Sequence, residues 1–398
     1  MRVVGLMSGT SADGVDAVLA RFNGSPHRPS WSLLGQASIP YPTSLQERIL
    51  AVGQGEPHSA AALLELAETI TEYQAAAAKA CDPDATCTLV GCHGQTVWHR
   101  PPERNGQDLT RRGASWQMLQ APLLAELLQR PVVHDFRAAD LALGGQGAPL
   151  VPMADAALLG AGPGWRALLN LGGIANLTLI PPQQGPDRQA AVVGWDCGPA
   201  NTLIDLAVEH FSSGQQRVDR NGERAAAGRV DEAVLQRWLQ EPYLQQPPPK
   251  STGRELFGRS DLQRRLAMLR HQPANDCIAT LTAFTAAVVA QDLEQVVHRG
   301  RPKPVELVVA GGGCHNPVLM KQLEQRCRGL RVRRSDELAL PASSREALVF
   351  ALLAWWHHCK HPGNAPAVTG ATQPSVLGVS VQPPGRQRLQ PGRFQPGR

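Results

Sequence analysis

The sequence of 398 residues lacks the motifs of the common nucleotide-binding loops. It contains five lysines, and none of them follows a glycine, so the G-x-x-x-x-G-K-[ST] loop of P-loop NTPases is absent. Neither "GGQGAP" nor "GGGCHN" completes the G-x-G-x-x-G turn that binds dinucleotides. The sequence therefore excludes a P-loop NTPase and disfavours a Rossmann dinucleotide-binding protein.

Cysteine pairs, long apolar runs and aromatic residues are also missing or scarce. The eight cysteines are irregularly spaced without a C-x-x-C pair, which is typical of scattered reduced thiols and not of a zinc or redox site. No basic start followed by an apolar stretch occurs, and no run approaches the roughly 18 apolar residues of a membrane span. These absences predict a cytoplasmic protein without a membrane partner.

Composition predicts a folded α/β protein. Apolar residues make up 42% of the chain, aromatic residues 5% and charged residues 18%, which favours an Ala/Leu-rich globular chain over a disordered one. Four arginines within the last 13 residues carry most of the net charge of +5, so the charge does not indicate nucleic-acid binding. The length favours two domains or one large α/β unit.

The apolar pattern predicts strands joined by glycine turns and followed by helices. "RVVGLM" and "VDAVLARF" are strand-like runs separated by a polar turn, and "RALLNLGGIANLTLI" repeats the arrangement. "VELVVAGGGCHNP" is a third strand that leads into a helix beginning near Asn316 and Pro317. Helices are predicted at 44–52, 60–80, 121–130, 276–297 and 344–358.

The glycine turns favour an anion-binding function. Successive backbone amides in tight turns form anion-binding concavities, and glycine permits a close approach to a phosphate. Two such hairpins, near Ser8–Asp13 and Gly172–Asn176, would clamp a triphosphate, and the turn at 310–313 fits a nucleoside base or a phosphate. The alternative is that each turn is merely tight.

Asp196 is the strongest candidate for an acid or base. It follows an apolar strand in "GWDCGPAN" and precedes Gly198 and Pro199, so its carboxylate is expected at the carboxyl end of that strand, in a cleft. There it would serve as a general base or as a Mg²⁺ ligand. A turn-forming or helix-capping aspartate is the structural alternative.

Eight ordered segments together resemble the bacterial 1,6-anhydro-N-acetylmuramic acid kinases. The segments run from about residue 3 to 381, and they are "GLMSGTSADGVD", "GCHGQTVWHRP", "DFRAADLALGGQGAPLVP", "LLNLGGIANLT", "GWDCGPANTLID", "PPKSTGRELF", "GGGCHNP" and "REALVFALLAW". This resemblance implies a two-lobed actin/hexokinase/Hsp70-like ATPase fold with ribonuclease H-like lobes and a central nucleotide cleft. It also implies a homodimer.

The resemblance further implies a reaction. ATP, water and 1,6-anhydro-N-acetylmuramic acid give N-acetylmuramic acid 6-phosphate and ADP, with Mg²⁺ as the metal cofactor, in the recycling of cell-wall (peptidoglycan) sugars. Asp196 matches the base that activates the water. Lobes are expected at 1–135, completed by 355–381, and at 136–354, followed by a Pro/Gly/Arg tail at 382–398 with the composition of a disordered segment.

The remaining site residues are carried over from the family by position. The ATP-phosphate segment corresponds to Gly9, Thr10, Ser11, Ala12, Asp13, Gly14, Val15 and Asp16, with Asp13 as a possible metal ligand. The second hairpin corresponds to Gly172, Gly173 and Asn176, and the adenosine side to Gly311, Gly312, Gly313 and Asn316. Positions that resemble sugar contacts are Thr96, Arg137 and Glu346. Arg137 is expected to pair with the lactyl carboxylate of the sugar, because a guanidinium fork suits a carboxylate.

Some positions depart from the family or stay ambiguous. Cys197 stands where the family commonly has Thr, Ala200 where it has Gly, and Ser343 or Ser344 where it has Asp. "DRNGE" at 219–223 is predicted to be a turn and not a calcium loop, and His93 either lies near the sugar or is satisfied by backbone.

Two other functions stay open on the sequence alone. One is an ordinary sugar or carboxylate kinase of the same superfamily, in which Asp196 deprotonates a substrate hydroxyl. The other is an ATP-driven binding switch like the Hsp70 nucleotide domain, which is disfavoured because only the short tail follows residue 381.

Overall fold

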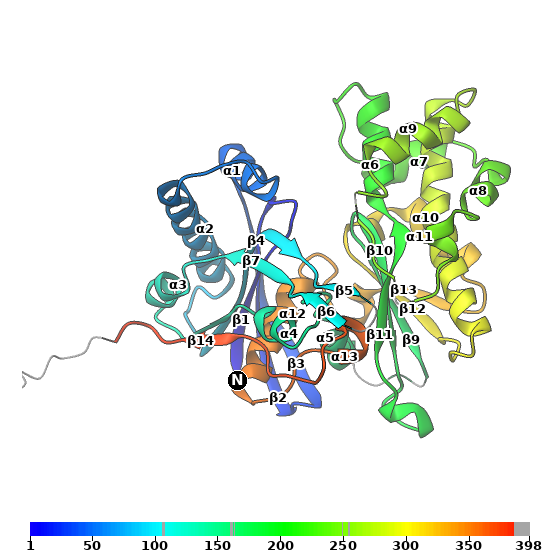
Figure 1. The fold of residues 1–398 in the computed structure, drawn as a ribbon. Helices are drawn as coiled ribbons and strands as arrows, with labels where there is room; N and C mark the ends of the chain where they lie inside the picture. Colours follow the sequence, from blue (N-terminus) through cyan, green and yellow to red (C-terminus); the bar gives the residue numbers. More distant parts are fainter. Residues whose placement is uncertain (106–107, 160–161, 163, 249, 254, 386–398) are drawn as a thin grey trace, which may run out of the picture. The chain divides into compact units, whose positions relative to one another are not determined.

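A computed structural model describes residues 1–105, 108–159, 162, 164–248, 250–253 and 255–385. The chain divides into two compact units (Figure 1). Unit 1 comprises Met1–Ala148, Glu346–Asn364 and Ala371–Arg398, and unit 2 comprises Pro149–Arg345 and Ala365–Gly370. The domain boundaries expected from the sequence stay predictions, and most of the expected tail lies outside the described residues.

Unit 1 is built on a mixed sheet with the strand order β14-β8-β4-β1-β2-β3, and β7 pairs with β4. The strands are β1 (Arg2–Ser8), β2 (Gly14–Ser25), β3 (Arg28–Pro40), β4 (Leu89–Arg100), β7 (Ala114–Met118), β8 (Val132–His134) and β14 (Val379–Val381). β5 (Glu103–Asn105) and β6 (Asp108–Arg111) pair separately. β1 and β2 are antiparallel, whereas β1 and β4 are parallel, so the predicted first hairpin is confirmed.

Helices and apolar side chains complete unit 1. The helices are α1 (Thr43–Gly53), α2 (Ala60–Cys81), α3 (Ala121–Leu128), α4 (Ala138–Ala142) and α12 (Arg345–His358). Ser59 caps α2 by accepting a hydrogen bond from the Ala62 amide at 3.1 Å. In α12 the ring of Trp355 stacks on Phe22 of β2 at 5.5 Å between centroids. Trp355 and Trp356 are both buried and pack within unit 1.

Unit 2 is built on a second mixed sheet with the order β11-β10-β9-β12-β13. Its strands are β9 (Arg166–Leu171), β10 (Ile174–Ile180), β11 (Val193–Pro199), β12 (Glu306–Ala310) and β13 (Arg331–Arg334). Its helices are α5 (Val151–Leu159), α6 (Asn201–Phe211), α7 (Glu223–Ala227), α8 (Glu232–Trp238), α9 (Arg259–Met268), α10 (Ala274–His298), α11 (Pro317–Arg326) and α13 (Pro366–Thr369). Short 3₁₀ turns are η1 (Pro186–Gln189), η2 (Arg220–Gly222), η3 (Pro242–Gln245), η4 (Gly312–His315) and η5 (Ser335–Leu338). The expected α/β class, with a mixed sheet and flanking helices in each unit, is confirmed.

Helix α10 forms the centre of the unit 2 core (Figure 1). By length and apolar composition it passes as a membrane span, yet 89% of that stretch is buried inside the protein. A buried core helix meets the same criterion, because it too is apolar all round. We therefore interpret α10 as the core helix of unit 2.

The polar segment between α6 and α10 contains short helices that the sequence pattern did not reveal. Within it, the "DRNGE" segment forms the predicted turn. Both carboxylate oxygens of Asp219 accept backbone hydrogen bonds, from Arg224 at 2.9 Å and from Ala225 at 3.0 Å. Because these oxygens are engaged by the chain itself, Asp219 holds the turn that starts α7.

Candidate active site

In unit 1, side chains from two other elements hold the glycine turn at Gly9–Asp13. The amide of Gln95 in β4 donates to the Gly9 carbonyl at 2.9 Å, and that of Gln46 in α1 donates to the Ser11 carbonyl at 3.1 Å. Ala12 adopts a positive φ of 53°, an uncommon conformation for a residue with a Cβ atom. The turn is therefore a fixed backbone feature of unit 1.

Two carboxylates follow this turn. Asp13 is exposed and Asp16 is half-buried, and the Asp13 Oδ1 accepts a hydrogen bond from Gln46 at 3.0 Å. Burial raises the pKa of Asp16, and the negative charge of Asp13 raises that pKa further, although a hydrogen bond with Ser38 opposes the shift. Gly14, between them, has room only for hydrogen, because a Cβ there would collide with the Ile39 carbonyl. The turn thus places the Asp13 carboxylate where its charge acts on Asp16.

Thr96 belongs to a row of polar side chains on β4 and β7. Gln117 donates to the Thr96 hydroxyl at 3.2 Å and to the Ser115 hydroxyl at 2.7 Å. The Ser115 hydroxyl also lies 3.0 Å from Nδ1 of His99. A pocket of about 340 Å³ in unit 1 is lined by both Thr10 and Thr96, so the structure brings one predicted nucleotide residue and one predicted sugar residue together.

Arg137 lies half-buried near this row. Its Nη1 donates to the Gly147 carbonyl at 2.7 Å, and its Nη2 donates to Nε2 of His93 at 2.9 Å. Burial lowers the pKa of Arg137 to about 10, and the negative charges of Glu346 and Asp140 oppose that shift. Arg137 and Glu346 are therefore within electrostatic reach of each other in unit 1. Partial burial, together with the positive charge of Arg137, also lowers the pKa of His99.

In unit 2, three polar residues form a row across neighbouring strands. Asn170 of β9 pairs with Asn176 of β10, and Asn176 pairs with Asp196 of β11. Directly paired residues project from the same face of a sheet, and all three are half-buried. The structure thus places Asn176 beside Asp196, and it adds Asn170, which the sequence analysis did not single out.

The carboxylate of Asp196 is held by the segment that follows Lys250. Oδ2 accepts hydrogen bonds from the Ser251 hydroxyl at 2.9 Å and from the Thr252 amide at 3.0 Å. Burial raises the pKa of Asp196 above its usual value; the bonds from Thr252 and Ser251 lower it, and the charge of Glu255 raises it. Asp196 is therefore a carboxylate with an elevated pKa and a fixed orientation, as a general base requires.

The two glycine turns of unit 2 lie at the carboxyl ends of parallel strands. β9 and β12 run parallel, with Ala310 paired to Asn170, so the turns after both strands lie at the same edge. Gly311 has a φ of +81°, and a Cβ there would lie 2.8 Å from both the Leu171 carbonyl and the Asn170 side chain. The close approach of these turns explains the glycine at 311.

Backbone and cap contacts fix the rest of this edge. The carbonyls of Gly172 and Gly173 accept hydrogen bonds from the start of α6 at 2.9 to 3.1 Å. Asn316 caps α11 through its Oδ1, which accepts from the amides of Val318 and Leu319 at 3.0 and 3.1 Å. Gly311, Gly312, Gly313 and Asn316 thus form one continuous strand–turn–helix connection, as expected.

The positions that depart from the family have different environments. Cys197 is fully buried next to Asp196, and burial raises the pKa of its thiol well above the usual range. A buried, protonated thiol is a packing residue and not a nucleophile. Ser343 is exposed, whereas Ser344 is buried.

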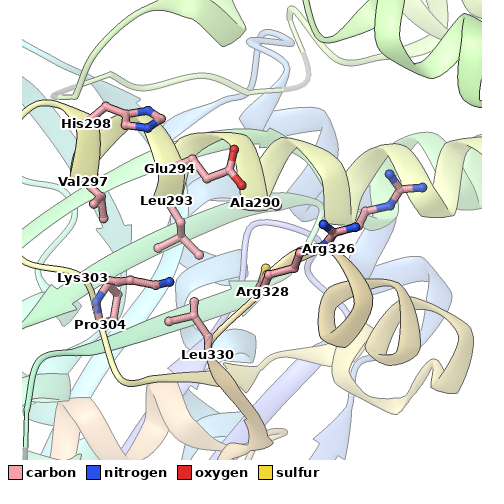
Figure 2. A pocket seen from close by; sticks show the side chains of 11 residues that line it. Ala290, Leu293, Glu294, Val297, His298, Lys303, Pro304, Arg326, Arg328 and Leu330 are labelled. Atoms are coloured by element: carbon pink, nitrogen blue, oxygen red, sulfur yellow. The ribbon is translucent and has the colours of Figure 1, made fainter.

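A further pocket of unit 2 lies at the opposite edge of the sheet (Figure 2). It measures about 360 Å³ and is bordered by the C-terminal ends of α10 and α11 and by the residues before β12 and β13. Basic side chains at helix C-termini are favoured by the helix dipole, which accounts for His298 and Arg326 at its rim. None of the predicted site residues lines this pocket.

Comparison with known proteins decides the family. The anhydro-N-acetylmuramic acid kinase family matches residues 1–383. The anhydro-N-acetylmuramic acid kinase of Synechococcus sp. (strain CC9902) is 68% identical over 384 residues, which is 96% of this chain and 100% of that protein. That of Prochlorococcus marinus (strain MIT 9303) is 64% identical over 383 residues, with the same coverage. The chain belongs to the anhydro-N-acetylmuramic acid kinase family.

The expected family is thereby confirmed, and so is the activity class. Members of the anhydro-N-acetylmuramic acid kinase family are ATP-dependent phosphotransferases of cell-wall sugar metabolism, and this chain is a kinase of that kind. Among solved structures, the chain is similar to a ROK family glucokinase from Streptomyces griseus in complex with glucose and AMPPNP. The TM-score is 0.36 at 15% identity, over 88% of this chain and 98% of that one.

Several residues of the candidate site were missed by the sequence analysis. They are Asn170, Gln117, Ser115, His99, Ser251 and Thr252. A usable signal existed for Asn170, which is a polar residue inside the apolar strand "RALLNL". Ser251 and Thr252 lie in the family segment "PPKSTGRELF", but their contact with Asp196 could not be read from it, because it joins positions 55 and 56 residues apart in the chain.

Proposed function

We propose that this kinase opens the 1,6-anhydro ring of 1,6-anhydro-N-acetylmuramic acid with water and phosphorylates O6 with ATP. The products are N-acetylmuramic acid 6-phosphate and ADP. Water oxygen bonds to C1, the C1–O6 bond breaks, and O6 takes the γ-phosphoryl group as ADP leaves. The water proton passes to Asp196 and then to solvent.

The observation that carries this proposal is the environment of Asp196. Both hydrogen bonds that the described residues make to its carboxylate fall on Oδ2, which leaves Oδ1 to accept a proton from water. Its raised pKa makes it a stronger base than an exposed aspartate. Proton transfer to such a group contributes about 10² to 10⁴ in rate.

The glycine turns are proposed to bind ATP. Gly9–Asp16 with Gly172, Gly173 and Asn176 would bind the phosphates through backbone amides and hydroxyls, and Gly311–Gly313 with Asn316 would bind the adenosine. Support comes from the fixed backbone of the first turn and from the close approach at Gly311. Without a P-loop lysine, phosphoryl transfer depends on amides and a metal for charge neutralisation.

The donor set fits a Mg²⁺ ion that is shared with the phosphates. Among the described residues no group of three or more His, Cys, Asp or Glu side chains is arranged to hold a metal. Mg²⁺ usually binds one or two carboxylates together with substrate phosphates and water. Asp13 and Asp16 supply two such carboxylates, and the mutual repulsion that contributes to the raised pKa of Asp16 would be relieved by a cation. Mg²⁺ would neutralise the phosphate charge there.

Thr96, Arg137 and Glu346 are proposed to bind the sugar. The hydrogen bonds from the Arg137 guanidinium to His93 and Gly147 use Nε and one N–H of each terminal nitrogen. With respect to the described residues, one N–H on each terminal nitrogen is therefore left for the lactyl carboxylate. A guanidinium pairs with a carboxylate through two parallel bonds in this way. A cytoplasmic location and a homodimer also stay proposals.

Turnover in ¹⁸O-labelled water tests the proposal. With 1,6-anhydro-N-acetylmuramic acid and Mg-ATP, we expect one label at the C1 hydroxyl of the product and none in its phosphate. Phosphorylated sugar without label at C1 would reject the hydrolytic step and favour an ordinary hydroxyl kinase. ATP turnover that does not depend on the sugar, without a phosphorylated product, would reject the kinase mechanism altogether.

A further inference from the structure

A buried ion pair lies behind Asp196. Lys250 Nζ and Asp292 Oδ1 are 2.8 Å apart, and each side chain is only 2% exposed. Lys250 belongs to the segment without helix or strand that precedes Ser251, whereas Asp292 lies within helix α10. The Lys250 ammonium also lies over the Tyr243 ring, 5.1 Å from its centroid. The pair therefore ties an irregular segment to the core helix of unit 2.

Asp292 also contacts the strand that carries Asp196. Its Oδ2 accepts a hydrogen bond from the Trp195 indole at 2.9 Å, and its negative charge adds to burial in raising the pKa of the Cys197 thiol. Trp195 and Cys197 are the immediate neighbours of Asp196 in β11. One carboxylate on α10 thus holds the strand at the residue before Asp196 and acts electrostatically on the residue after it.

Three consecutive residues of the other segment contact Asp196. The Asp196 amide donates to the Lys250 carbonyl at 3.0 Å, and Ser251 and Thr252 donate to Oδ2. Ser251 is exposed, Thr252 is half-buried, and Lys250 is the buried member. The orientation of the donors to Asp196 therefore depends on where the Lys250 side chain is held.

The Lys250–Asp292 ion pair indicates a role other than stability. Burying two charges has a desolvation cost that well-packed apolar side chains would avoid, so such a pair is weak evidence for stability as such. The pair restricts the position of the Lys250 side chain, because its ammonium lies between the Asp292 carboxylate and the face of the Tyr243 ring. We propose that Lys250 and Asp292 are positioning residues that set the orientation of the Asp196 carboxylate toward water; this inference rests on the proposed role of Asp196 as the base.

Loss of the Lys250–Asp292 pair should affect kcat and the KM for ATP differently. Lys250 and Asp292 contact the backbone of Asp196 and the side chain of its neighbour Trp195. Within the described part of the chain, no hydrogen bond or ion pair joins either side chain to a residue proposed to bind ATP. A displaced base lowers the rate of the chemical step, and a misplacement of about 1 Å can cost about 10² in rate. Loss of the pair is therefore expected to lower kcat while the KM for ATP is retained.

The experiment compares Lys250→Met, Lys250→Arg and Asp196→Asn with a matched control, Glu306→Gln. Glu306 of β12 forms a buried ion pair with Arg166 of β9, in the sheet that also contains Asp196. Both residues begin their strands, whereas the glycine turns follow the strand ends. Each variant is assayed for kcat, for KM of ATP and of the sugar, and for Tm. Lys250→Met is expected to lower kcat by about 10- to 100-fold with the KM for ATP within about twofold, and Lys250→Arg is expected to recover part of the loss. Glu306→Gln is expected to lower Tm without lowering kcat.

The outcomes separate the inference from the function on which it rests. If Asp196→Asn loses turnover and Lys250→Met keeps normal kcat, the positioning role is overturned and the proposed function stands. If Asp196→Asn keeps normal turnover, the proposed function fails and the inference fails with it. If Lys250→Met and Glu306→Gln lose the same factor in kcat for each degree of Tm lost, the loss of kcat follows from lower stability. The Lys250–Asp292 pair would then have only a structural role.

A surface variant keeps the test decisive if Lys250→Met does not fold. Ser251→Ala removes one donor to Asp196 from an exposed position and leaves the core pair intact. We expect kcat to fall several-fold with the KM for ATP unchanged. Normal kcat in Ser251→Ala would overturn the proposal that this segment orients the base.

Discussion

His93 and Arg137 are joined by a hydrogen bond that fixes the protonation of the imidazole. Nε2 of His93 accepts from Arg137, and Nδ1 lies 2.9 Å from the Gly94 carbonyl, to which it must donate. Burial, together with the positive charge of Arg137, lowers the pKa of His93 well below its usual value of 6.5. A neutral histidine thus orients the guanidinium that we propose for the sugar carboxylate.

The first prediction concerns stability and pH. Because the folded state holds His93 neutral, its contribution to stability is complete above the unfolded pKa of about 6.5 and is lost as the pH falls below that value. His93→Gln removes this titration and can keep an acceptor for Arg137. We expect the Tm of the wild type to fall more steeply than that of the variant between pH 8 and pH 5. Parallel Tm curves would contradict the buried neutral state.

A second prediction concerns the role of Arg137. Arg137→Met removes hydrogen bonds to a charged group, each worth about 1.5 to 3 kcal/mol, so the KM for the sugar should rise by at least about tenfold. The KM for ATP should stay within about twofold. Arg112→Met is the control, since the exposed Arg112 side chain donates to the Ala142 carbonyl and, among the described residues, makes no hydrogen bond to Thr96, Arg137 or Glu346. Its loss should leave both KM values unchanged. A normal sugar KM in Arg137→Met would exclude the carboxylate contact.

A third prediction sets activity against stability at Asp196. Its pKa is raised in the folded protein, so the ionised form is disfavoured by folding, and stability falls as the pH rises through that pKa. Asp196→Asn removes the buried charge and is expected to keep or raise Tm at pH 7.5. The same variant should lose kcat by at least about a hundredfold.

The pH dependence of wild-type kcat follows from the same group. A base must be deprotonated, so kcat should fall as the pH drops through a pKa that lies above 3.8. Stopped assays from pH 4 to 8 measure kcat, and thermal melts measure Tm, for the wild type and for Asp196→Asn. A lower Tm for the asparagine variant would contradict the cost assigned to burial, whereas unchanged kcat would remove Asp196 from the chemistry.

A fourth prediction concerns the close approach at Gly311. Gly311 and Gly300 have almost equal φ angles, +81° and +82°, but an added Cβ would meet other atoms within 4 Å at Gly311 and open space at Gly300. Both alanine variants incur strain of about 1 kcal/mol or more at positive φ. Gly311→Ala should lose more stability than Gly300→Ala and should also raise the KM for ATP. Equal unfolding free energies in urea would show that the contact with Leu171 does not restrict this turn.

Much of the local structure could be predicted because it is encoded in neighbouring residues. The apolar runs around "GLMSGTSADGVD" and "NLGGIAN" predict strands joined by turns, and both hairpins are present. Asn316 and Pro317 predict a helix start, which the capping bonds of Asn316 confirm. The short helices α7 and α8 were not predicted, because helices of five to seven residues show little periodicity.

The environment of the candidate base depends on register and long-range contacts. Asn176 faces Asp196 only because the pairing of β10 and β11 shifts between Ala175 and Asn176. A shift of one residue would turn the side chain to the other face of the sheet. The pairing of Gln117 with Thr96 lies beside a similar irregularity in β4. These irregularities are properties of paired strands and leave no distinct pattern in either strand alone.

The sequence by itself determined the family, the strand and helix segments, the glycine turns and the identity of Asp196 as the leading acid. These features depend on residue type, short spacing and ordered motifs, which can be read along the chain. Tertiary structure alone decided that Ser251 and Thr252 bind Asp196 and that Lys250 pairs with Asp292, 42 residues away. Such contacts form where packing brings distant segments together. Burial and the neighbouring charges then shift the pKa of each ionisable group.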